Sequence, residues 1–163
     1  MKTLYHGSPQ IVDAPEIIKP NRTLDFGDGF YLTSSMRQAK DWVQRHKDEG
    51  SSTGYVNTYA FSISAARKSL SILEFQAPTE EWLDFVMSNR RIRGFTHNYD
   101  VVIGPVANDR VYTAFSLYES GIISKDVLIK ELKTYRLVDQ YLFHTPKALE
   151  FLKFVSAKTI HYD

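Results

Sequence analysis

Segments with strand character follow one another along this chain too closely for a helical crossover to fit between every pair. We expect strands at 3–6, 29–33, 55–63, 70–75, 99–103, 140–143 and 157–160. We expect helices at 36–48, 109–119 and 124–132, and two more that begin near Pro78 and Pro146. Parallel neighbours need a crossover of about a dozen residues or more, so most neighbouring strands must run antiparallel. The pattern predicts an α+β fold with mixed, largely antiparallel sheets and flanking helices.

Length and composition are those of one ordinary domain. The chain has 163 residues, 43% of them apolar and 24% charged, and a chain of this size buries about two thirds of its unfolded surface. No internal linker separates two cores, so we expect residues 1–163 to form a single domain. The net charge of +1 gives no general attraction to nucleic acid or to an anionic membrane. The absence of cysteine excludes disulfides, thiolate metal sites and a cysteine nucleophile.

The ends and the apolar segments of the sequence carry no membrane signal. The first ten residues, MKTLYHGSPQ, lack the apolar run of a signal peptide. The longest apolar runs, such as 101–103, are far shorter than the roughly 20 residues that span a bilayer. We therefore expect a cytoplasmic protein without a membrane partner.

Common site motifs are absent. No two of the five histidines have the i, i+4 spacing of a helical zinc site, so we expect no metal. The glycine patterns of nucleotide-binding loops and of serine-hydrolase elbows are also missing. One feature suggests function: residues 9–28, rich in Pro, Gly and Asp, form a long irregular loop, and such loops are often functional.

Three short segments carry groups suited to binding a flat ligand. In LYHGS, His6 ends a strand and is followed by Gly7, whose bare backbone can approach a ligand closely. In DFGDGFYLT, two glycines lead into a strand that carries Tyr31, an aromatic ring suited to stacking. In DQYLFH, polar groups including Gln140 stand at the mouth of an apolar strand. Taken singly, each segment also fits a simpler structural role: a surface histidine before a turn, a hairpin with a core tyrosine, or a strand start.

In combination, the three segments resemble the ADP-ribosyltransferase superfamily, in the branch related to poly(ADP-ribose) polymerases. That branch has a His-Gly after its first strand, a Gly-x-Gly-x-Tyr strand, and a later strand in which Glu precedes an aromatic and aliphatic residues. The chain is still more similar to a bacterial family of transferase-like domains that share YHGS, DFGxGFYLT and QYLFHT. The resemblance covers roughly residues 3–155.

The resemblance implies a split sheet that holds NAD+ as co-substrate in the cleft between its two parts. It implies that His6 bonds the adenosine ribose, that the Gly7 backbone binds the nicotinamide carboxamide, and that Tyr31 stacks on the nicotinamide ring. Trp42, on the following helix, would supply the opposite aromatic surface, with a buried core tryptophan as the alternative. Ser8 and Gly29 belong to the same two motifs and complete the expected cofactor-binding set.

The catalytic set is expected to centre on Gln140, which stands where the related enzymes have Glu. A neutral amide cannot act as a general base but can hydrogen-bond a ribose hydroxyl. This departure favours a single transfer over chain elongation, and the neighbouring Asp139 would point to the other face of the strand. Asp109 and Arg110 offer a base and a cation after a buried strand, with helix capping as the alternative. The arginines at 90, 91 and 93 could contact a nucleic-acid acceptor or form a solvated loop.

These observations predict an NAD+-dependent mono-ADP-ribosyltransferase that modifies a macromolecular acceptor, either protein or nucleic acid. By family analogy it would act as a bacterial toxin or effector with a small neutralising, antitoxin-like partner. Two alternatives remain open: an NAD+ glycohydrolase, in which water is the acceptor, and an inactive domain that binds NAD+, ADP-ribose or a protein.

Overall fold

A computed structural model gives the fold and describes residues 1–19, 24–46 and 50–162. Within them, the strands are Lys2–Ser8 (β1), Phe30–Leu32 (β2), Thr53–Phe61 (β3), Ile72–Glu74 (β4), Val101–Pro105 (β5), Asp139–Phe143 (β6) and Leu152–His161 (β7). The helices are Met36–Arg45 (α1), Ile63–Ser69 (α2), Glu80–Arg91 (α3), Asp109–Glu119 (α4), Lys125–Leu132 (α5) and Pro146–Leu149 (α6). The last part of the helix expected at 36–48 lies outside the described residues.

Side-chain caps fix where most helices begin. The hydroxyls of Ser35, Thr79 and Ser124 accept from backbone N–H groups in the first turns of α1, α3 and α5. The side-chain oxygens of Asn108 and Thr145 do the same for α4 and α6. Such caps satisfy backbone donors that have no partner within the helix.

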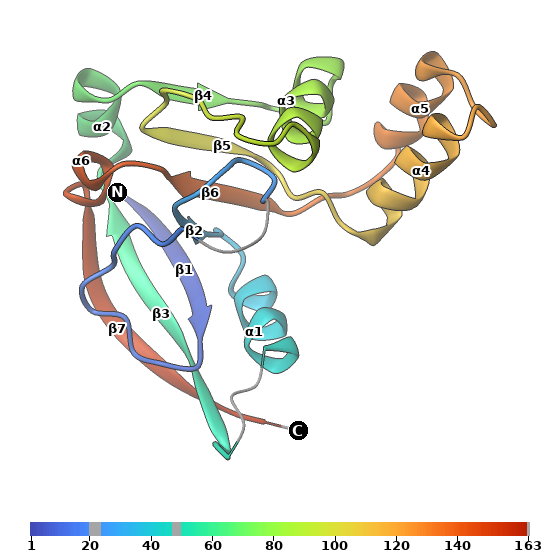
Figure 1. Cartoon of the computed structure of the whole chain (residues 1–163). Coiled ribbons are helices and arrows are strands. Elements are labelled where there is room, and N and C mark those ends of the chain that lie inside the picture. Colours follow the sequence, from blue (N-terminus) through green and yellow to red (C-terminus); the bar gives the residue numbers. More distant parts are fainter. Residues whose placement is uncertain (20–23, 47–49, 163) are drawn as a thin grey trace.

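The strands form two separate sheets, which confirms the expected α+β class (Figure 1). One sheet has the order β1-β3-β7 and is antiparallel throughout. The other has the order β2-β6-β5-β4, in which only the pair β4–β5, connected along the chain through α3, is parallel. The sheets meet at one isolated antiparallel bridge between Tyr5 of β1 and Thr33 after β2.

Apolar side chains fill three clusters that order these layers. The first lies between the two sheets and includes Leu4, Phe30, Tyr59, Phe61 and Phe143. The second packs the other face of the β2-β6-β5-β4 sheet against α3, α4 and α5, and includes Trp82, Val102, Phe115, Leu128 and Leu142. A small third cluster holds α1 on the outer face of β1 and β3. Strand β5 is buried on both faces, which explains its unbroken apolar sequence.

Several elements differ from the sequence-based expectation. Helix α2 was not expected; it is short and lies between the strands expected at 55–63 and 70–75. Helix α3 extends to Arg91, so Arg90 and Arg91 belong to its last turn and not to a loop. Strand β7 begins at Leu152, so it is longer than the strand expected at 157–160.

No helix in the described part of the chain is long and apolar enough to cross a membrane. That residues 1–163 form one domain stays a prediction.

Candidate functional site

The two sheets separate just after the backbone bridge that joins them. Tyr5 and Thr33 exchange two backbone hydrogen bonds of 2.8 and 2.9 Å. If this pairing continued, Gly7 would lie opposite Tyr31. Instead, Nδ1 of His6 donates to the Tyr31 carbonyl at 2.7 Å, and β1 and β2 diverge. The structure therefore brings His6, Gly7 and Tyr31 together at the split between the sheets.

The peptide groups of Gly7 face into this split. In an antiparallel strand, backbone N–H and C=O groups point alternately to one side and the other. Those of Tyr5 bond to Thr33, so those of Gly7, two residues later, point to the same side and away from β3. The same alternation turns the peptide groups of Tyr31 towards β1. The N–H and C=O of Gly7 thus offer a donor and an acceptor next to each other, the pair that a carboxamide requires.

Gly7, Tyr31 and Gln140 share the outer face of the joined sheets. The register pairs Tyr31 with Leu142, and its extension pairs Thr33 with Gln140, so their side chains lie on one side of the sheet. Helix α1 packs on the same side at Gly7. A Cβ atom at position 7 would lie 2.4 Å from the Ala39 carbonyl oxygen, so only glycine lets α1 approach this closely.

Trp42 lies beside Gly7, near the position expected of a second aromatic surface. A Cβ atom at Gly7 would be 3.3 Å from Cδ1 of Trp42. The Trp42 side chain is 38% exposed, so it is not a buried core residue. Its ring stacks on His46, with 3.8 Å between the ring centroids.

The glycine segment before β2, residues 25–29, holds the Tyr31 ring in place. The Tyr31 hydroxyl donates to the Gly27 carbonyl at 2.6 Å and accepts from the Phe26 N–H at 3.0 Å. Burial raises the pKa of this hydroxyl far above its usual value, with the neighbouring carboxylates Asp25 and Asp28 adding to the effect, so it stays neutral. The φ of +93° at Gly27 is a left-handed conformation that favours glycine and lets the chain curl around the hydroxyl.

His6 is poised as a neutral acceptor. Burial lowers its pKa, and the bond to the Tyr31 carbonyl opposes that shift. Because Nδ1 must carry the proton that it donates to this carbonyl, the neutral ring leaves Nε2 as a bare acceptor. The ring packs against Phe30, with centroids 4.2 Å apart. Nε2 is the atom that could receive a ligand hydroxyl.

Gln140 lies against a carboxylate that the sequence analysis did not single out. Its Nε2 donates to Oδ2 of Asp25 at 3.2 Å. The Asp25 carboxylate also accepts from the Ala107 N–H at 3.2 Å and from the Tyr112 hydroxyl at 2.5 Å, and Arg90 lies 3.7 Å away. The Asp25 side chain is only 11% exposed. Its place as the first residue of DFGDGFYLT was a signal that could have identified it.

The structure also locates the other expected site residues. Asp139 does not share the Gln140 contacts: its carboxylate accepts from the N–H of Ser34 at 2.8 Å and from the hydroxyls of Ser34 and Thr33. The Ser8 hydroxyl accepts from the Gln10 N–H in the turn after β1. Gly29 packs against β6, where a Cβ atom would lie 2.4 Å from the Phe143 carbonyl oxygen.

Asp109 and Arg110 lie in a different hollow, between α4 and α5. Asp109 is the first residue of α4, directly after its Asn108 cap. The Arg110 guanidinium lies over the Tyr135 ring, 4.1 Å from its centroid. In the described residues, neither Asp109 nor Arg110 hydrogen-bonds to Gln140. The carboxylate that lies next to Gln140 is that of Asp25.

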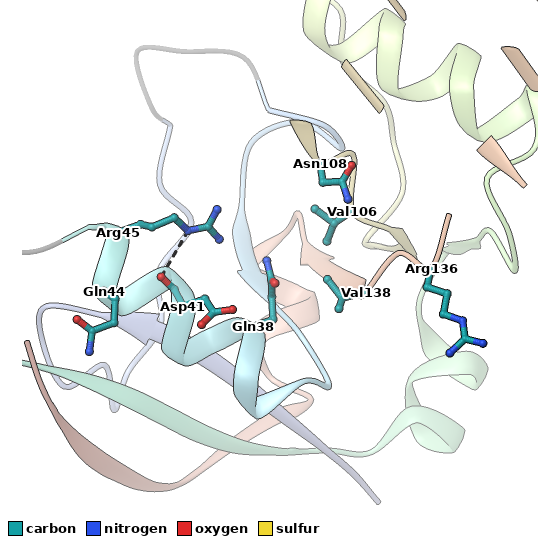
Figure 2. A pocket seen from close by; sticks show the side chains of 8 residues that line it. All are labelled: Gln38, Asp41, Gln44, Arg45, Val106, Asn108, Arg136 and Val138. Atoms are coloured by element: carbon teal, nitrogen blue, oxygen red, sulfur yellow. Dashed lines mark hydrogen bonds between the residues drawn. The ribbon is translucent and has the colours of Figure 1, made fainter. Parts of the chain in front are cut away.

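A second hollow of about 490 Å³ borders the Gln140 end of β6 (Figure 2). Four polar residues of α1 line one side of it: Gln38, Asp41, Gln44 and Arg45. The other lining residues are Val106, Asn108, Arg136 and Val138. The Val106 N–H donates to the Val138 carbonyl at 2.8 Å, which extends the β5–β6 pairing. Val138 precedes Gln140 by two residues and so lies on the same face of the sheet.

Two histidines anchor the glycine segment from the opposite side. Nε2 of His97 donates to the Phe26 carbonyl at 2.7 Å, and Nδ1 of His144 donates to the Asp28 carbonyl at 2.6 Å. Their ring centroids are 4.2 Å apart. Burial and the neighbouring His144 lower the pKa of His97, against the opposing effect of the Phe26 carbonyl. In the described residues, no group of three or more His, Asp or Glu side chains is arranged to hold a metal ion.

We predict that the protein loses stability as pH falls below about 6.5, the pKa of histidine in the unfolded chain. The pKa values of His6 and His97 are lowered in the folded state, so below that pH the unfolded chain binds more protons until the folded pKa values are passed. Each histidine contributes at most about 1.4 kcal/mol per pH unit in that window. Urea unfolding at several pH values measures this slope. His97→Gln should reduce it, whereas the exposed His161→Gln should not; an equal slope in both variants would contradict the assignment.

Comparison with known proteins gives a family for the chain. No curated protein matches it significantly. Residues 2–154, almost the whole length, match the family described as protein of unknown function (DUF3990). The chain is therefore a member of the DUF3990 family.

Proposed function

We propose that this protein is a mono-ADP-ribosyltransferase that uses NAD+ and transfers one ADP-ribose unit to a macromolecular acceptor. The observation that carries the proposal is the split between β1 and β2, where His6 bonds to the Tyr31 carbonyl and the backbones of Gly7 and Tyr31 face each other. The Gly7 N–H and C=O suit the nicotinamide carboxamide, and the Tyr31 and Trp42 rings suit its flat faces. The motif resemblance to ADP-ribosyltransferases supports the same arrangement.

The proposed reaction breaks the bond between nicotinamide nitrogen and ribose C1′ and forms a bond from C1′ to the acceptor. Nicotinamide leaves with the bonding electron pair and becomes neutral, and the acceptor loses its proton to water. Positive charge develops on the ribose during this step, as in glycoside hydrolysis. Gln140 would accept a hydrogen bond from a ribose hydroxyl and hold the sugar in the reactive orientation. His6 would accept one from the adenosine ribose through Nε2.

A single transfer is favoured over polymer formation. Extending a chain requires activation of a hydroxyl of the previous ADP-ribose unit, and the neutral Gln140 amide cannot take its proton. The hollow beside Val106 and Val138 borders the same end of β6 and is the proposed entry for the acceptor. A cytoplasmic location and a role as a toxin or effector with a small neutralising protein are further parts of this proposal, on family analogy.

Tyr31→Ala should weaken NAD+ binding by roughly 1–3 kcal/mol, the usual range for stacking between an aromatic side chain and a flat ring. Isothermal titration with NAD+ measures the change. Tyr31→Phe keeps the ring but loses both hydroxyl hydrogen bonds to the glycine segment, so affinity should stay within a few-fold while stability falls by about 1 kcal/mol. Tyr118→Ala, at an exposed tyrosine on α4, is the control. Unchanged affinity in folded Tyr31→Ala would contradict the stacking role.

Incubation of the purified protein with NAD+ tests the function itself. Release of nicotinamide together with radiolabel transfer from adenine-labelled NAD+ to a protein or nucleic acid is the expected result. Release with free ADP-ribose as the sole other product would instead identify a glycohydrolase. Binding of NAD+ without release would identify a binding domain, the alternative that the neutral side chain at position 140 favours.

A further inference from the structure

Gln140 has one side of its amide fixed and the other side open. A carboxylate offers hydrogen-bond acceptors, so the amide atom of Gln140 that bonds to Asp25 is Nε2. The carbonyl oxygen Oε1 therefore points elsewhere. In the described part of the chain no residue donates to Oε1, and no fully buried side-chain oxygen lacks a partner, so Oε1 is not fully buried.

The Asp25 carboxylate is held at both of its oxygens. An ionised carboxylate offers about four lone-pair positions. The Tyr112 hydroxyl and Arg90 approach Oδ1, and the Ala107 N–H and Gln140 Nε2 approach Oδ2. Arg90 also lies over the Tyr112 ring at 4.8 Å, which ties the donors to one another. These three donors and Arg90 come from β6, α4, the segment after β5 and α3, so the carboxylate is held by several packed elements.

We propose that Asp25 is the positioning residue of the site: it fixes the Gln140 amide with Oε1 towards the cleft, where this oxygen accepts a ribose hydroxyl. This inference rests on the proposed function. It explains how a neutral amide can present an oxygen where related enzymes have a carboxylate. A charge-assisted hydrogen bond from Nε2 to Asp25 also polarises the amide and makes Oε1 a better acceptor.

A double-mutant cycle on NAD+ turnover tests the coupling. In the Asp25→Asn variant, residue 25 no longer dictates which way the Gln140 amide faces. The kcat should therefore fall at least tenfold, while KM for NAD+ stays within about threefold. In a Gln140→Ala background, Asp25→Asn should change kcat by less than about threefold, because the group through which it acts is already gone. Glu119→Gln removes a carboxylate that pairs with Arg91 on the outer surface and should leave kcat unchanged. Losses that multiply in the double variant would overturn the inference.

A second variant keeps the test valid if Asp25→Asn fails to fold. Gln140→Glu places two carboxylates against each other at the position of the present 3.2 Å contact, where one of them must hold a proton near neutral pH. The turnover of Gln140→Glu should therefore depend on pH in the neutral range, where that of the unaltered protein should be flat. A pH profile without this step would show that Asp25 does not face position 140.

NMR separates failure of the inference from failure of the proposed function. The Gln140 side-chain NH₂ signals should show one downfield proton, bonded to Asp25, that moves upfield in Asp25→Asn. If this signal behaves as expected but the protein neither binds nor cleaves NAD+, the proposed function fails and the positioning role in turnover fails with it. If NAD+ is cleaved but the signal is the same in Asp25→Asn, the function stands and the inference is overturned.

Discussion

Gln140→Ala is expected to lower the rate of nicotinamide release from NAD+ by about ten- to a thousand-fold. The loss follows from misorientation: without Oε1 the ribose has no fixed acceptor at this end of β6, and orientation of bound reactants supplies several kcal/mol of a barrier. Steady-state kinetics measure the change in kcat. Stability should change little, because the side chain is half-buried and its partner, Asp25, keeps the Ala107 N–H and the Tyr112 hydroxyl as donors, with Arg90 nearby.

Gln76→Ala is the matched control for that variant, since it makes the same chemical change at an exposed loop position and should leave kcat unaltered. Equal turnover in Gln140→Ala and in the unaltered protein would contradict the assignment of the third motif.

Gly29→Ala is expected to cause the largest loss of stability, about 3 kcal/mol. The φ of +148° at Gly29 is a conformation that L side chains rarely adopt. The added Cβ would also lie 2.6 Å from Cδ1 of Leu142 and 2.4 Å from the Phe143 carbonyl oxygen, and the second contact can be relieved only by movement of the backbone. In a protein of this size the loss corresponds to a fall in Tm of roughly 6–12 °C.

Gly121→Ala separates the two causes of that loss. Gly121 has a φ of +80°, and a Cβ there meets nothing within 4 Å, so only the backbone contribution of about 1 kcal/mol remains. Thermal unfolding of both variants measures the difference. Equal losses would show that close packing between Gly29 and β6 contributes nothing.

Local signals were sufficient for much of the fold. The helices expected from residues 36, 109 and 124 begin at Met36, Asp109 and Lys125, each directly after a side-chain cap. Strand β7 was predicted only in part, because much of its length is exposed and polar and its residues adopt a strand by pairing with β3. Val155, for example, is 58% exposed, so no apolar alternation marked this segment. Pairing between distant segments decides such strands, and local sequence does not record it.

The candidate site could likewise be predicted only in part from the sequence. His6 and Gly7 adjoin in sequence, and a glycine-rich segment before an aromatic strand indicated Tyr31. The contact between Asp25 and Gln140 joins residues 115 positions apart, so no spacing pattern could reveal it. Asp109 was preferred because it follows a buried strand, yet the Asn108 cap directs the chain into α4 immediately. A carboxylate near Gln140 was a chemically sound expectation; its identity depended on the path of the long loop before β2.

Titration of isotope-labelled protein with NAD+, followed by the backbone amide NMR signals, tests the central claim most directly. If nicotinamide lies in the split between β1 and β2, the amide signals of Gly7 and Tyr31 should shift strongly, and those of His6 and Trp42 should follow at the same NAD+ concentration. Signals from the hollow between α4 and α5, such as those of Thr113 and Val127, should stay in place. Shifts confined to that hollow, or no shifts at millimolar NAD+, would contradict the account.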